Sequence, residues 1–146
     1  MKGFLKQNWI RWVVVLPGAL LAGFLATFPL HWILYLVFAH NGTLFGFIEL
    51  PPRADIPIEY FMYPFVIAIV FVFTGYRIAP AHKLKVASIL FVVYFISWII
   101  ASIIALEGSI NGVSFIFSGR TIFALVGAGL GWYLAKKDSN KERLTP

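Results

Sequence analysis

The chain contains no cysteine, and charged residues are scarce along its 146 residues. Without cysteine there is no disulfide, no thiolate metal site, no iron–sulfur centre and no cysteine nucleophile. Only 12% of the residues are charged, whereas a soluble domain carries about 25%. A soluble protein with so little charge would expose large apolar patches, so an ordinary soluble domain is excluded.

Sequence signatures of catalysis and of ligand binding are also missing. No glycine-rich loop is followed by Lys-Ser or Lys-Thr, which leaves phosphate cradling unsupported. The three histidines, His31, His40 and His82, do not have the spacing of metal ligands. No pair of acidic residues lies within an apolar stretch, which argues against an aspartyl intramembrane protease. We therefore expect no catalytic residue, no metal and no cofactor, and we expect that the chain is not an enzyme.

Hydrophobic residues make up 60% of the chain and gather in four stretches, at residues 12–38, 60–76, 84–106 and 113–135. A helix needs about 20 apolar residues to cross the hydrocarbon core of a bilayer. The connections between the stretches are too short to build a core of their own. We predict one all-α domain over residues 1–146, an integral membrane bundle of four transmembrane helices.

Two polar segments flank these helices. The basic N-terminal segment, residues 1–11, fits two interpretations, an amphipathic helix in the membrane interface or the frayed start of the first span. The C-terminal tail, residues 136–146, is polar, and its part from Asp138 to Pro146 is predicted to be disordered.

Positive charge is distributed unevenly around the four stretches. Ten of the 12 Lys and Arg residues lie near the two termini or in the second connection, all on one side if the helices thread in order. Four acidic residues fall on the opposite side: Glu49, Asp55, Glu59 and Glu107. Because cytoplasmic loops carry the excess of Lys and Arg, both termini are predicted to be cytoplasmic, in a plasma (inner) membrane. This asymmetry also accounts for the net charge of +6, so no nucleic-acid partner is expected.

Aromatic residues and prolines refine the picture of the individual spans. Tyr76 is interpreted as an interface residue at the inner end of the second span. That span is almost entirely Phe, Val and Ile, which favours a helix that faces lipid. In the first span, Pro29 is predicted to kink the outer half, and Pro17 to lie in the first turn, where proline costs little.

Small residues follow one another at four-residue spacing in two of the spans. Such faces let helix backbones approach closely. The predicted packing residues are Gly18, Ala22, Gly23 and Ala26 in the first span, and Gly127 and Gly131 in the fourth. We expect these two faces to pack against each other.

His31 and Arg120 are the strongly polar side chains well inside the spans, and ionisable residues at such positions suggest function. Each lies about seven residues from the outer end of its span, roughly 10 Å deep, so the two could meet. Thr27 and Tyr35 share the helix face of His31 at four-residue spacing. The nearest counter-ions for Arg120 are Glu107 and Glu59. The alternative is that Arg120 only anchors the interface by snorkelling or forms a structural ion pair, while His31 hydrogen-bonds a neighbouring helix.

These features favour a small polytopic membrane protein that acts as a non-catalytic subunit, accessory or regulatory partner of a membrane complex. Its partners would be the lipid bilayer and either other membrane proteins or further copies of itself. The alternative is a small oligomeric channel or transporter that uses His31 and Arg120 in its outer half, with an anion as the favoured cargo. An intramembrane enzyme ranks third.

Overall fold

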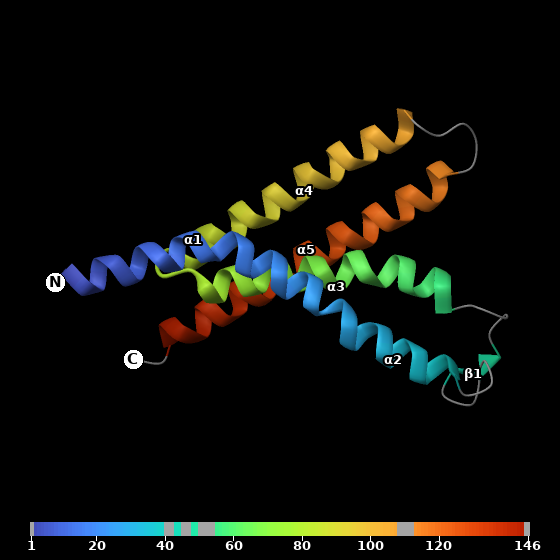
Figure 1. Ribbon diagram of the computed structural model, residues 1–146, viewed down its shortest axis with the longest axis horizontal. Coiled ribbons are helices and arrows are strands. Elements are labelled where there is room, and N and C mark those ends of the chain that lie inside the picture. Colours follow the sequence, from blue (N-terminus) through green and yellow to red (C-terminus); the bar gives the residue numbers. More distant parts are fainter. Residues whose placement is uncertain (1, 40–42, 45–47, 50–54, 108–112, 145–146) are drawn as a thin grey trace.

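The computed structural model describes the backbone of residues 2–39, 43–44, 48–49, 55–107 and 113–144 and the side chains of 9–37, 58–101, 103–104 and 119–141. The described chain is almost wholly helical (Figure 1). Its helices are α1 (Lys2–Leu25), α2 (Thr27–Ala39), α3 (Asp55–Ile78), α4 (Lys83–Glu107) and α5 (Val113–Leu144). Two short strands, β1 (Thr43–Leu44) and β2 (Ile48–Glu49), pair antiparallel between α2 and α3.

Three segments are long and apolar enough to cross a membrane: Trp9–Val37, Ile58–Ile78 and Lys83–Ala101. They correspond to the first three predicted spans. The fourth predicted span lies in α5, which is helical over the whole predicted stretch. Its described side chains alone do not form a segment long and apolar enough to cross a membrane. Its described apolar part runs only from Gly119 to Ala135, contains Arg120, and continues into a polar segment.

The first apolar stretch is broken at Ala26, which separates α1 from α2. Pro29 causes this break, because it has no N–H to donate to the carbonyl of Leu25 and its ring crowds that carbonyl. The Thr27 hydroxyl donates to the carbonyl of Phe24 at 2.7 Å and so stabilises the bend. The expected kink is therefore present, and it lies about one turn before the proline.

Two expectations about the ends of the helices are wrong. Because α1 begins at Lys2, the basic segment is continuous with the first apolar helix and Pro17 lies inside α1 rather than in its first turn. The polar tail is not disordered over residues 138–144, since α5 continues to Leu144. An ion pair between Arg77 of α3 and Asp138 of α5, 3.1 Å long, fastens this extension to the bundle.

The centre of the bundle is α3, which packs against α1, α2, α4 and α5. Its residues Ala68, Val72 and Tyr76 are fully buried, and Phe71 is nearly so. The expectation that this helix faces lipid is wrong, because its large apolar side chains fill the space between the other helices. Tyr76 is accordingly a core residue and not an interface residue.

The small-residue faces of α1 and α5 do not pack against each other; in the described residues these two helices make no contact. Each face instead lies on α3. A Cβ at Gly23 would lie 3.3 Å from the carbonyl oxygen of Ile67, and a Cβ at Gly131 would lie 2.8 Å from that of Ile69. Gly127 is closer still to the backbone of Phe65. The large side chains of α3 thus lie between two small-residue faces, which let the helix backbones approach closely.

The helices diverge toward one end of the bundle (Figure 1). Both termini lie at the end where the helices are gathered, and α2 and α4 separate widely at the other. In the described residues α2 packs on α1, α3 and β1, while α4 packs on α3 and α5. The outward faces of α2 and α4 therefore carry many exposed large apolar side chains, such as Trp32, Leu36, Ile100 and Ile104.

Candidate functional site

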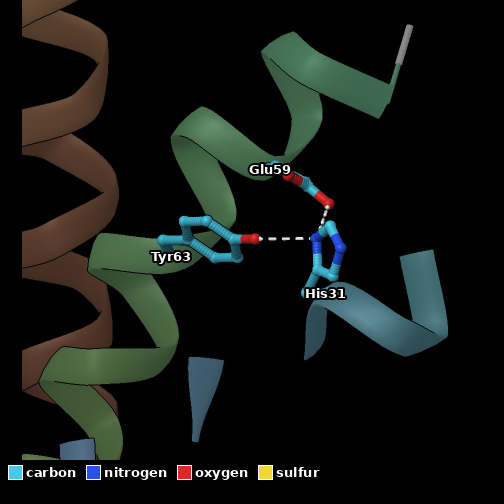
Figure 2. Close-up of polar contacts among 3 residues, drawn as sticks. All are labelled: His31, Glu59 and Tyr63. Carbon is cyan, nitrogen blue, oxygen red and sulfur yellow. Dashed lines mark hydrogen bonds and ion pairs between the residues drawn. The ribbon is translucent and has the colours of Figure 1, made fainter. Parts of the chain in front are cut away.

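A polar cluster joins α2 to α3 on the side of the bundle (Figure 2). Nδ1 of His31, on α2, lies 2.8 Å from Oε1 of Glu59 and 3.2 Å from the hydroxyl of Tyr63. Glu59 and Tyr63 lie on the same face of α3 because they are four residues apart. The bend at Ala26 sets the course of α2, so the break in the first helix determines where His31 meets α3.

The cluster has two arrangements of its protons. When Nδ1 carries hydrogen, it donates to the Glu59 carboxylate and the Tyr63 oxygen can accept as well. When Nδ1 carries no hydrogen, its single lone pair accepts a hydrogen bond either from the Tyr63 hydroxyl or from a protonated Glu59 carboxyl. The three side chains can thus hold or exchange a proton at an identified set of atoms.

The surroundings of the cluster are apolar and open. The side chain of His31 is 52% exposed and that of Glu59 is 20% exposed. Trp32 and Tyr35 beside it are also exposed, and the Tyr35 ring stacks on His31 with centroids 6.5 Å apart. Nε2 lies on the side of the ring away from Tyr63 (Figure 2), and it makes no hydrogen bond within the described residues. The cluster is therefore an exposed edge of the bundle and not an enclosed pocket.

Arg120 does not join this cluster. Its guanidinium carbon lies 4.5 Å from the ring centroid of Tyr60 on α3 and 5.5 Å from that of Trp98 on α4. Within the part of the chain whose side chains are described, no ion pair or hydrogen bond links Arg120 to His31 or Glu59, and its buried Nε has no hydrogen-bond partner. Cation–π contacts to two aromatic rings therefore hold the cation between three helices.

The site residues predicted from the sequence do not all lie together in the structure. It brings together His31, Glu59 and Tyr35, and it sets Arg120 apart. The Thr27 hydroxyl donates to the backbone carbonyl of Phe24 in α1, and Thr27 is not part of the cluster. Glu107 lies outside the described side chains. Tyr63 was not predicted as a site residue, although its position four residues after Glu59 places the two side chains on the same helix face.

Tyr60 and Trp98 were not predicted as partners of Arg120. No spacing rule reveals this contact, because the three residues lie on three different helices. Only the packing of α5 on α3 and α4 brings them together.

No group of three or more potential metal ligands occurs among the described side chains. Comparison of the chain with protein-family models, with curated proteins and with solved structures finds no match.

Proposed function

We propose that this chain is a non-catalytic component of a membrane complex, a bundle of four transmembrane helices with both termini in the cytoplasm. The observation that carries the proposal is the half-exposed His31 on an apolar, aromatic face of α2. Lipid chains cannot hydrogen-bond Nε2, whereas polar groups on a neighbouring helix can. Exposed Trp and Tyr beside a hydrogen-bonding group are also typical of the centre of a protein interface.

The close packing at the centre of the helix bundle favours a subunit of a membrane complex over a pore formed within a single chain. Ala68, Phe71, Val72 and Tyr76 fill the middle of the bundle and leave α3 in contact with every other helix. Among the described side chains, these apolar residues occupy the space between the helices where a path for water or ions would have to run. Any conduction would have to occur between chains.

The interface can be tested by purifying the full chain from its native membrane in mild detergent. We expect a partner in constant stoichiometry, and we expect His31→Ala and Glu59→Gln each to reduce its recovery at least tenfold. Leu36→Ala is the matched control, because Leu36 is 62% exposed on the same helix and makes no polar contact. Equal recovery from all variants would exclude the α2–α3 edge as the interface.

The second candidate function is a small oligomeric channel or transporter. The cluster of His31, Glu59 and Tyr63 favours it, because side chains that exchange protons within spans often serve as relays. A pure homo-oligomer in the same purification would favour this candidate. Glu59→Gln should then abolish any pH-dependent flux in reconstituted vesicles, while Leu36→Ala should leave it intact.

Membrane orientation can be tested separately, since the chain has no native cysteine. Single cysteines placed at Lys83 and Ser139 should react with a membrane-impermeant thiol reagent only from the cytoplasmic side. A cysteine at Asp55 should react only from outside. This expectation follows from the Lys and Arg excess on one side of the bundle. Labelling of the Lys83 position from outside would reverse the proposed orientation.

A further inference from the structure

An apolar groove of about 450 Å³ runs between α1 and α4, which make no contact with each other in the described residues. Leu16 and Leu20 form its α1 wall, Phe71 of α3 lies at its base, and Trp98 and Ala101 belong to its α4 wall. The few polar atoms along it are already bonded within the protein. The Ser97 hydroxyl donates to the carbonyl of Val93 at 2.8 Å, and the Tyr94 hydroxyl donates to that of Pro64 at 3.0 Å. The groove thus suits a hydrocarbon chain better than a polar molecule.

Trp98 contacts both this groove and the guanidinium of Arg120. Its ring lines the groove, and it also lies 5.5 Å from the guanidinium carbon of Arg120. The two aromatic contacts of Arg120 leave its charge without an anion among the described side chains. A guanidinium is always charged, and its planar fork of donors matches the oxygens of a phosphate.

We propose that the groove and Arg120 together bind one acidic glycerophospholipid. An acyl chain would lie along Phe71 between α1 and α4. The phosphate would pair with Arg120, near the end of the bundle where α4 ends and α5 begins. Charge selects this occupant over a partner helix, because an apolar helix would leave the arginine unneutralised within the membrane. The inference requires that the chain lies in a membrane, but it does not depend on the proposed protein partner.

The test uses the full chain in neutral detergent, with bound lipid measured by native mass spectrometry. We expect one phosphatidylglycerol per chain, bound at least tenfold more tightly than phosphatidylcholine with the same acyl chains. Arg120→Gln should abolish this preference, and Arg120→Lys should restore it in part, since lysine keeps the charge but not the fork. Lys85→Gln is the charge-matched control, because Lys85 is exposed near the opposite end of α4.

The acyl chain is tested independently of the arginine. Ala101→Phe fills the groove without altering a charge and should weaken phosphatidylglycerol binding at least tenfold. Ile100→Phe, at an exposed neighbouring position of α4, should leave binding unchanged. Glycerol 3-phosphate, which has the anion but no acyl chain, should not compete.

Three results would overturn the proposal. The first is an unchanged lipid preference in Arg120→Gln, and the second is unchanged binding in Ala101→Phe. The third is effective competition by glycerol 3-phosphate, which would indicate a site for soluble anions. If Arg120→Gln does not fold, Arg120→Lys and Ala101→Phe still decide the question.

Discussion

Gly127→Ala is expected to destabilise the bundle by about 1–3 kcal/mol, the usual range for overpacking a tight contact. The added Cβ would meet the backbone of Phe65 on α3, lying 3.0 Å from its carbonyl carbon and closer to its oxygen. A backbone cannot rotate away as a side chain can, so α3 and α5 would have to separate. The measurement is the unfolding midpoint of the purified chain in detergent micelles, and Gly127→Leu should give a still lower value.

Gly129→Ala is the matched control for this prediction. It lies on the same helix two residues away, and a Cβ there would meet nothing within 4 Å. Alanine is also the better helix former, by about 1 kcal/mol in water, so this variant should be neutral or slightly stabilising. Equal effects of the two substitutions would mean that α5 does not pack on α3 through Gly127.

Tyr76→Ala should be the most damaging single truncation in the core, with a cost of about 3–5 kcal/mol, as for other large buried aromatic residues. Tyr76 is fully buried, and its ring stacks on Phe73 with centroids 6.1 Å apart. Removing the ring would leave a cavity close to where α3 ends and α4 begins. The unfolding midpoint in detergent reports the loss.

Tyr133→Ala distinguishes a core role from an interface role. Tyr133 is 56% exposed on α5, so its truncation should change stability by no more than about 0.5 kcal/mol. If Tyr76→Ala proved as mild as Tyr133→Ala, Tyr76 would belong to the interface, as the sequence alone suggests.

The amino-acid sequence by itself determines the helices of this protein. Runs of apolar residues with so few charges can satisfy their backbone only as helices, and the boundaries of α3, α4 and the start of α5 follow the predicted stretches within a few residues. Pro29 also predicts the break in the first stretch, because the loss of one backbone donor is a local effect. Part of the candidate site could also be predicted, since His31 is a strongly polar side chain within the first predicted span and Glu59 is an acidic residue next to the start of the second.

The tertiary structure decided which helix occupies the centre. Hydrophobicity does not separate a lipid-facing span from a buried one, because lipid and a protein core are equally apolar. The contacts of α3 with Gly23, Gly127 and Gly131 show that its large side chains fit between two small-residue faces, and this complementarity between helices is not contained in any one segment. The same packing separated Arg120 from His31 and placed it between Tyr60 and Trp98. Contacts among three helices depend on their relative rotation, and that rotation is set by how closely their side chains pack.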